Sequence, residues 1–155
     1  MKDVDPEVIV IQAGTNNVGG RPGGQAKVDG IVAGIEAIVE SSRIRAPDAE
    51  LILTANFPCS ESAVVSEIEA INNRLEQLAK NHGLRFLNIN ERLADEDGLL
   101  LDEVSSDGLH LSEAGYEVWA DALRPVLTEL LGPPAAADQA PPATGTTRPP
   151  GCNWF

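Results

Sequence analysis

Three stretches of the chain have the near-continuous hydrophobic pattern of buried strands. They are residues 7–13 (EVIVIQA), 50–55 (ELILTA) and 84–89 (LRFLNI). The first is rich in β-branched residues and does not alternate with polar ones, which is typical of a parallel strand covered on both faces. The pattern therefore predicts a sheet enclosed by other elements.

Hydrophobic positions recur at helical spacing between and after these strands, over residues 28–39, 64–78 and 118–130. The first helix is expected to end near Ala46, because the proline that follows disfavours helical geometry in the residue before it. Gly83 is a natural end for the second helix. The third is expected to begin around Ser112 and to end at Gly132-Pro133.

The resulting order is β-α-β-α-β-loop-α, which predicts an α/β fold with a parallel sheet and right-handed crossovers. Ligands of such sheets bind at the carboxyl ends of the strands. Three loops leave those ends, at residues 14–24, 56–62 and 90–111. The residues that bind or react with a ligand are therefore expected in these loops.

The first of these loops reads Gly14-Thr15-Asn16-Asn17. A glycine directly after a buried strand allows a sharp turn that lifts the next side chains above the sheet edge. Asn16 would then direct amide donors into the crevice, as an oxyanion hole requires. Two alternatives stay open, an asparagine-rich turn that caps its own backbone and a phosphate loop. The phosphate loop ranks low, because the sequence has neither a P-loop ending nor G-x-G-x-x-G spacing.

The third loop contains Asp107 and, three residues later, His110. On a tight turn this spacing lets the carboxylate accept a hydrogen bond from Nδ1 while Nε2 points into the crevice, which is the orienting half of a Ser-His-Asp arrangement. The alternative is a loop histidine with an incidental acidic neighbour. The other histidine, His82, is explained by its place at the end of a helix.

Charge and cysteine content narrow the function classes. The 155 residues include 24 acidic and 11 basic ones, for a net charge of -13. This balance argues against nucleic acid or an anionic membrane as a partner. No apolar run approaches the roughly 18 residues of a membrane span. The two cysteines, Cys59 and Cys152, are too few for a disulfide scaffold or a cysteine-rich metal site. The acidic stretch at residues 95–98 lacks the ligand spacing of a calcium loop.

Composition changes at Gly132. Residues 132–155 are rich in proline, alanine and threonine and have no net charge, so the whole -13 belongs to residues 1–131. The sequence therefore predicts one domain over 1–131 and a linker or disordered tail over 132–155. The final residues, 152–155, are either the start of a further module or part of that tail. The first residues do not have the pattern expected of a secretory signal. The proline- and threonine-rich tail favours export only weakly, and the location stays open.

Two blocks of the sequence, VIVIQAGTNN and SSDGLHLSEAGYEVWADAL, together resemble the SGNH (GDSL-type) hydrolases, particularly the platelet-activating-factor-acetylhydrolase-like esterases. The resemblance covers residues 5–131. It implies a three-layer flavodoxin-like sheet and a serine ester hydrolase that acts on a small acyl ester, such as an acetylated sugar or lipid, without metal or cofactor. His110 would be the general base and Asp107 its orienting acid. Gly14, Asn16 and Asn17 would form the oxyanion and substrate-binding loop, with Asn17 at a position that is often aspartate.

The sequence departs from the family at the nucleophile. The Gly-Asp-Ser block of the first family strand and the glycine block after it are absent, and none of the eight serines follows Gly-Asp. Ser60, Ser105 and Ser106 belong to the loops of interest, but each is more simply a turn or cap serine. No nucleophile is therefore identified. We expect residues 1–131 to be the C-terminal portion of the domain, the alternative being a non-catalytic pseudoenzyme or binding module.

The missing family strand would pair with residues 7–13. Without it, this hydrophobic strand has an unpaired edge, and such edges recruit other chains. We therefore expect the chain alone to be marginally stable, to self-associate or to need its absent N-terminal part.

Overall fold

A computed structural model describes residues 5–18 and 24–134 of the chain, so the predicted tail beyond residue 134 lies outside the described residues. The elements are β1 (Val8–Ile11), η1 (Thr15–Asn17), α1 (Gly24–Arg45), β2 (Glu50–Thr54), η2 (Ser62–Val64), α2 (Val65–His82), β3 (Arg85–Leu87), η3 (Asn90–Arg92) and α3 (Glu113–Leu131). All three predicted strands and all three predicted helices are present. Each strand is shorter than its hydrophobic run.

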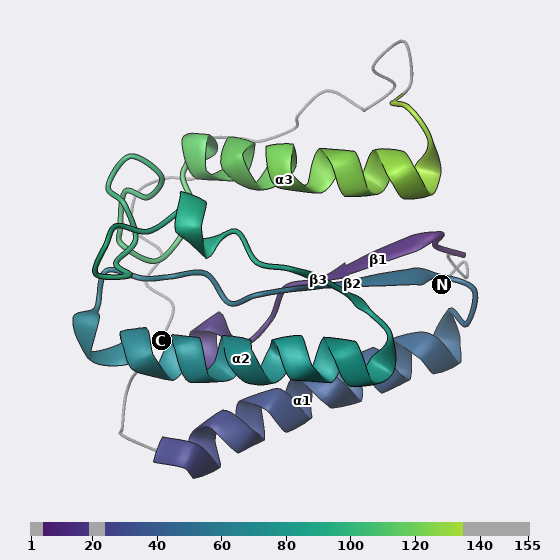
Figure 1. Cartoon of the computed structure of the whole chain (residues 1–155), viewed down its shortest axis with the longest axis horizontal. Helices are drawn as coiled ribbons and strands as arrows, with labels where there is room; N and C mark the ends of the chain where they lie inside the picture. The colour runs from purple at the N-terminus through teal and green to yellow at the C-terminus, as the bar shows by residue number, and fades with distance from the viewer. Residues whose placement is uncertain (1–4, 19–23, 135–155) are drawn as a thin grey trace, which may run out of the picture.

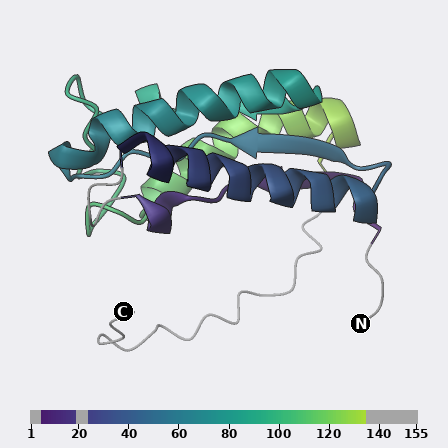
Figure 2. The ribbon, with the colours of Figure 1, turned by 90° about the horizontal axis from the view of Figure 1, so that it is seen from below.

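The three strands form one parallel sheet in the order β1-β2-β3. Ile9 is in register with Leu51, and Leu53 with Phe86. The two crossover connections, β1-α1-β2 and β2-α2-β3, move in the same direction across the sheet. When two such connections have the same handedness, their helices lie on the same face of the sheet. Accordingly α1 and α2 lie side by side on one face and α3 on the other (Figures 1 and 2). This three-layer arrangement confirms the predicted α/β fold.

Each face of the sheet has its own hydrophobic core. The core under α1 and α2 consists of Ile11, Val28, Val32, Ile35, Val39, Leu51, Leu53, Ile71, Leu75, Leu78 and Ala79. The core on the α3 side consists of Phe57, Ile89, Leu93, Leu100 and Val104, with Trp119 of α3 packed against it. The second core is built mostly from loop residues, and α3 itself has only the small Gly115 fully buried.

The helix ends follow the local signals in the sequence. Gly83 closes α2 in the left-handed conformation, at φ 63°, which glycine adopts without the strain of a side chain. The side chain of Ser112 caps α3 by accepting a hydrogen bond from the backbone N–H of Gly115 at 3.4 Å. Helix α1 ends at Arg45, one residue before the expected position. The predicted boundaries are confirmed to within about a residue.

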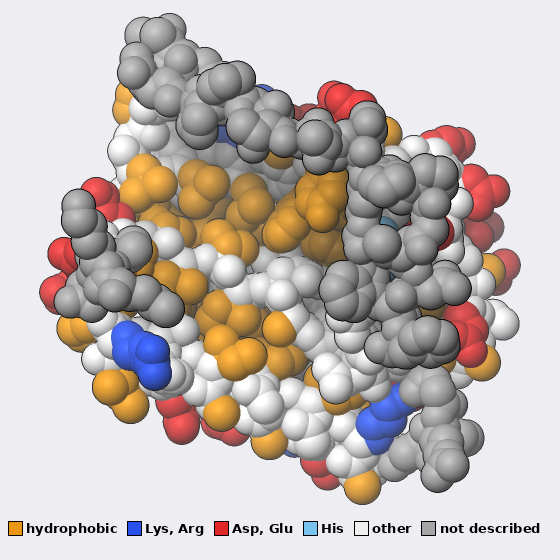
Figure 3. All heavy atoms as spheres, turned by 180° about the vertical axis from the view of Figure 1, so that it is seen from behind, with side chains coloured by type: hydrophobic (Ala, Val, Ile, Leu, Met, Phe, Trp, Pro, Cys, Tyr) orange, Lys and Arg blue, Asp and Glu red, His pale blue; other side chains and the backbone are white. Residues whose placement is uncertain are grey.

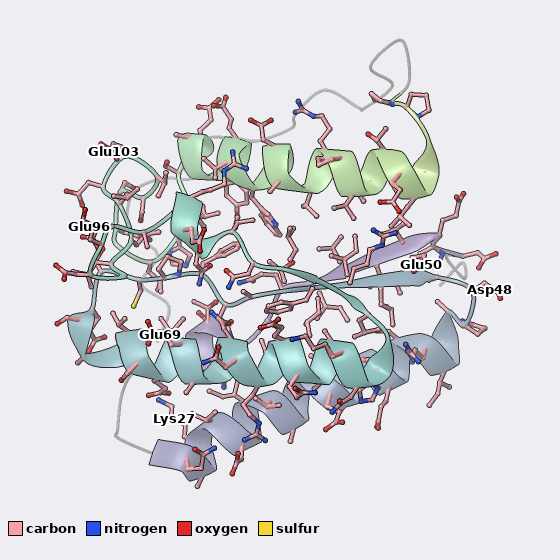
Figure 4. All side chains as sticks on the ribbon, viewed as in Figure 1. Lys27, Asp48, Glu50, Glu69, Glu96 and Glu103 are labelled. Atoms are coloured by element: carbon pink, nitrogen blue, oxygen red, sulfur yellow. The ribbon has the colours of Figure 1, made fainter. Side chains whose placement is uncertain are left out.

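The strands of the parallel sheet all begin at one end of the sheet and finish at the other. Asp48 and Glu50 mark the end at which β2 begins, whereas Glu96 and Glu103 lie on the long loop at the opposite end, where the strands finish (Figure 4). The loops that follow β1, β2 and β3 all gather at this second end (Figure 1). The fold therefore brings the three predicted loops together. None of the helices in the described ranges is long and hydrophobic enough to span a membrane.

Candidate active site

Asp107 and His110 form a closed hydrogen-bonded turn just before α3. The Oδ2 atom of Asp107 lies 2.7 Å from Nδ1 of His110, and Oδ1 accepts the backbone N–H groups of Leu109 at 3.0 Å and of His110 at 2.7 Å. One carboxylate therefore fixes both the backbone of the turn and the orientation of the ring. The histidine ring is largely solvent-exposed, with 74% of its side-chain surface accessible, which leaves Nε2 open to a reactant.

These hydrogen bonds lower the pKa of the Asp107 carboxyl group well below its ordinary value of 3.8. The backbone N–H of His110 is the largest cause, followed by the His110 ring and the backbone N–H of Leu109. All three favour the ionised form. Asp107 is therefore a carboxylate throughout the pH range in which a histidine acts as a base.

The titration of Asp107 tests this account of the turn. Because the folded-state pKa is depressed, ionised Asp107 stabilises the fold above its unfolded pKa of about 3.9, and this contribution is lost as the pH falls further toward the folded value. The largest cause of the lowered Asp107 pKa is the backbone N–H of residue 110, and a His110→Ala variant retains it. We expect a carbon-13 NMR titration to show a depressed Asp107 pKa in the wild type and most of that depression in the variant. An ordinary pKa in the wild type would contradict the described turn.

Close backbone contacts hold this turn against its surroundings. Gly108 has φ +73°, and a Cβ atom built there would lie 2.8 Å from the Ser60 side chain. The Gly108 carbonyl accepts the Ser60 N–H at 2.8 Å. A Cβ atom on Gly115 would lie 2.5 Å from the Val104 carbonyl oxygen. Glycine is therefore required on both sides of His110 for the loop to close onto α3.

The loop after β1 is a short turn of similar construction. Gly14 has φ +113°, and its carbonyl accepts the N–H of Asn17 at 2.9 Å. A Cβ atom on Gly14 would lie 2.9 Å from the Asn56 side-chain amide. Asn56 Oδ1 also accepts the Thr15 hydroxyl at 3.3 Å. The turn that presents Asn16 thus rests directly on Asn56, the second residue after β2.

Asn56 is in turn held by two other asparagines that sequence reasoning did not single out. The side chain of Asn72, on α2, accepts the Asn56 N–H at 2.7 Å and donates to the Asn56 carbonyl at 2.9 Å. Asn90 donates to the same carbonyl at 2.9 Å. Asn56 and Asn72 are 1% and 7% exposed. This asparagine cluster, with Asn56 and Asn72 buried and Asn90 half-buried, ties all three strand-end loops to α2.

A pocket of about 200 Å³ joins the two predicted motifs. Its lining residues are Gln12, Thr15, Asn16, Phe57, Leu109, His110, Leu111, Tyr116 and Trp119. Asn16 and His110, 94 positions apart in the sequence, therefore face one cavity. Three aromatic rings form part of its wall, and the ring of Phe57 meets that of Trp119 edge to face at 5.3 Å. No local pattern in the sequence predicts this wall, because Phe57 lies in the loop after β2 whereas Tyr116 and Trp119 lie on α3.

The other predicted residues lie beside this pocket rather than in it. Gly14 and Asn17 line a neighbouring groove against α1. All eight serines belong to the described residues, and none lines the pocket of Asn16 and His110. Ser105 is 5% exposed, and its hydroxyl accepts the Gly108 N–H. Ser60 and Ser105 therefore serve the structure of the His110 turn, and no nucleophile is assigned.

Metal-binding side chains do not gather in the described part of the chain, where no group of three or more His, Cys, Asp or Glu residues is placed to hold an ion. The acidic stretch at residues 95–98 is a turn in which Asp95 Oδ1 accepts the N–H groups of Asp97 at 3.0 Å and Leu99 at 2.9 Å. The thiol of Cys59 is free and buried.

Comparisons with known proteins identify relatives that are similar in sequence and in fold. The α2 subunit of platelet-activating factor acetylhydrolase IB is 29% identical over 141 residues in Homo sapiens and 27% identical over 136 residues in Rattus norvegicus. Each match covers 84% of this chain and 56% of the relative, so the chain spans about half the length of these proteins. The crystal structure of a GDSL-like lipase from Bacteroides thetaiotaomicron superposes with a TM-score of 0.69 at 25% identity, over 81% of this chain and 64% of that one.

The match to a family model covers most of the chain. Residues 1–118 match the GDSL-like lipase/acylhydrolase family, a range that includes β1, the Asn16 turn and the Asp107–His110 turn. The structural neighbour has the same α/β architecture, of which this chain holds three parallel strands. Sequence, fold and family model agree, and the chain belongs to the GDSL-like lipase/acylhydrolase family, the SGNH hydrolases.

Proposed function

We propose that residues 1–131 are the C-terminal portion of a serine ester hydrolase domain that acts on a small acyl ester. One observation supports this most strongly: Asn16 and His110 line one pocket, and the His110 ring is held by Asp107 at 2.7 Å. A base with an oriented ring and an amide donor facing the same cavity are two of the three parts that acyl transfer through a serine requires.

The proposed chemistry assigns one task to each side chain. Asp107 holds the Nδ1–H of His110, which leaves Nε2 to accept the proton of a serine hydroxyl as its oxygen attacks the ester carbonyl. The side-chain amide of Asn16 donates to the oxyanion of the tetrahedral intermediate. His110 returns the proton to the departing alcohol, and a water molecule activated in the same way then releases the acid. Gly14 and Asn17 shape the turn that presents Asn16.

The size and wall of the pocket support a small substrate. A cavity of about 200 Å³ lined by aromatic rings and His110 suits a short acyl chain or a single sugar ring more than a long lipid chain. The matched relatives are subunits of a platelet-activating factor acetylhydrolase, a name that denotes the hydrolytic removal of an acetyl group. An acetylated sugar or lipid is therefore the substrate class we propose for this chain.

The nucleophilic serine is proposed to lie in a polypeptide segment outside these 155 residues, since no serine lines the pocket. The second candidate function, a non-catalytic pseudoenzyme or binding module, rests on that same observation. A fluorophosphonate probe, which reacts with activated serines, separates the two functions.

We expect no labelling of the 155-residue chain by this probe. We expect stoichiometric labelling, measured by intact-protein mass spectrometry, after the chain is extended by natural upstream residues that include a Gly-Asp-Ser segment. Labelling of the 155-residue chain itself would contradict an external nucleophile. An extended protein that folds and remains unlabelled would favour the non-catalytic function.

We also propose that the chain, as it stands, self-associates through the open edge of its sheet. Within the described residues β1 pairs only with β2, and Val10 is 37% exposed. Hydrophobic strands with a free edge recruit other strands. A monodisperse monomer that unfolds cooperatively would contradict this proposal.

A further inference from the structure

Three aromatic side chains form a continuous series in the wall of the pocket that contains His110. Phe57, which is 7% exposed, lies at the buried end of the series, and its ring meets that of Trp119 edge to face at 5.3 Å. The ring of Tyr116 comes next, with its centroid 6.0 Å from that of Trp119 and an interplanar angle of 34°. Tyr116 is 57% exposed. The series therefore runs from the hydrophobic core to the surface of the protein.

This aromatic wall lies on the side of the site where the alcohol part of an ester would leave. In the proposed reaction the C–O bond between the acyl carbon and the alcohol oxygen breaks, and that oxygen takes the proton held by His110 Nε2. The alcohol must therefore lie against the residues around His110. Leu109 and Leu111 are its neighbours in the chain, and Tyr116 and Trp119 lie on the first two turns of the helix that follows.

The polar groups of the same pocket are neutral when His110 acts as a base. They are the side-chain amides of Gln12 and Asn16 and the hydroxyls of Thr15 and Tyr116. The Gln12 amide is held in place by its hydrogen bond to the Thr15 hydroxyl at 3.2 Å. Its carbonyl oxygen accepts no hydrogen bond from the described residues. A hydroxyl group of a ligand can therefore donate to Gln12 Oε1.

The charges near this pocket disfavour an anionic alcohol. Within the described part of the chain, no lysine or arginine lines the pocket. Asp107 holds the His110 ring, and Glu113 and Glu117 are exposed on the same turns of α3 as Tyr116. In the view from behind, acidic side chains gather at the end of the molecule where the strands finish (Figure 3). A phosphate group would therefore meet carboxylates here and would leave the water without a cation to pair with, which is costly.

We infer that Tyr116 and Trp119 form the binding site for the alcohol part of the ester, and that this alcohol is a neutral sugar ring. The sugar site rests on the proposed function and narrows its substrate class from an acetylated sugar or lipid to an acetylated sugar. A sugar ring has C–H groups on its faces and hydroxyls at its edge. Its face packs on aromatic rings, and its hydroxyls bond to neutral amides such as that of Gln12. A choline group also packs on aromatic rings, but it has no group that could bond to the amide.

A specificity ratio tests the role of Tyr116. The ratio compares kcat/KM for an acetylated methyl glucoside with kcat/KM for methyl acetate, which has the same acyl group and an alcohol too small to reach the aromatic wall. The protein is the form that also contains the nucleophilic serine, and the release of acetate is measured. We expect Tyr116→Ala to lower this ratio at least about 10-fold. Tyr116→Phe, which keeps the ring, should lower it less than about threefold.

The two esters use the same base and the same oxyanion donor, so a variant that folds poorly loses both activities and keeps the ratio. The matched control is Leu131→Ala at the far end of α3, where the leucine is 50% exposed, and it should leave both rates as in the wild type. If the wild type hydrolyses both esters and Tyr116→Ala leaves the ratio unchanged, the sugar site is overturned and the proposed function is not.

Binding of the free alcohol tests the site without any hydrolysis. The chain has two tryptophans, Trp119 and Trp154, so in a Trp154→Phe variant of the 155-residue chain the indole N–H signal in an NMR spectrum belongs to Trp119. We expect methyl glucoside to shift this signal saturably, and we expect Tyr116→Ala to weaken the binding at least about 10-fold. Choline and phosphocholine should leave the signal in place.

The two measurements distinguish a failure of the sugar site from a failure of the hydrolase. A saturable shift with methyl glucoside, in a protein whose serine-containing form hydrolyses no ester, supports the sugar site and contradicts the proposed function. A shift with choline or phosphocholine and none with methyl glucoside overturns the sugar and points to a lipid headgroup. No shift with any of the three, in a chain whose spectrum is that of a folded protein, overturns the site itself.

Discussion

Replacement of His110 with alanine is expected to lower ester hydrolysis by about 10³-fold or more in a form of the protein that also contains the nucleophilic serine. His110 is the base among the described residues that line the pocket shared with Asn16, so its loss leaves the serine proton without an acceptor. The measurement is kcat/KM for p-nitrophenyl acetate, with far-UV circular dichroism to show that the variant folds. The effect should fall on kcat, because the ring is needed for proton transfer rather than for binding.

The chain offers a matched control for this substitution in its second histidine. His82 Nε2 lies 3.0 Å from Glu36 Oε1, a side-chain contact between α2 and α1 on the other face of the sheet. His82→Ala should therefore leave kcat/KM within about twofold. Asp107→Asn should give an intermediate loss of about 10²–10⁴-fold, because the amide no longer favours the ring orientation and proton position that the carboxylate imposes.

Equal rates for the wild type and the His110→Ala variant would contradict the proposed function. The same result would leave the family assignment intact, since that rests on the match over residues 1–118. A large loss in His82→Ala with no change in His110→Ala would place the base on the wrong face of the sheet.

The fold was predictable because its signals are local. Hydrophobic runs located the three strands, while Pro47 and Gly83 located two helix ends. The strands are shorter than these runs, and residues just beyond them contribute to the site. Beyond β1, the Gln12 side chain donates to the Thr15 hydroxyl at 3.2 Å. Beyond β2, the Asn56 side chain lies against the Gly14 turn.

The site was predictable only in part. Asp107 and His110 are three residues apart, so their contact depends on one turn and can be inferred from spacing. The pocket wall of Phe57, Tyr116 and Trp119 depends on how α3 packs over the sheet, which no local pattern specifies. The asparagine cluster did leave a signal: Asn72 follows Ile68 by four residues and so shares the hydrophobic face of α2, where a polar side chain needs a partner.

The second large effect is expected on stability, at Asn72. Asn72→Leu keeps the approximate volume of the side chain but removes the acceptor for the Asn56 N–H and one of two donors to the Asn56 carbonyl. A buried N–H left without a partner costs about 1–3 kcal/mol, and the lost second bond adds to it. We expect the free energy of unfolding to fall by about 2–3 kcal/mol.

The neighbouring asparagine separates this effect from a change in helix propensity. Asn73 lies on the same helix and is exposed, so Asn73→Leu should change the free energy of unfolding by no more than about 0.5 kcal/mol. Urea unfolding followed by circular dichroism, at one protein concentration for all variants, measures both. Because Asn56 also supports the Gly14 turn, Asn72→Leu should increase hydrogen exchange at the Asn17 N–H, which bonds to Gly14, and Asn73→Leu should not. Equal behaviour of the two variants would show that the asparagine cluster does not hold the Asn16 turn, and the amide that we place at the oxyanion would then need another support.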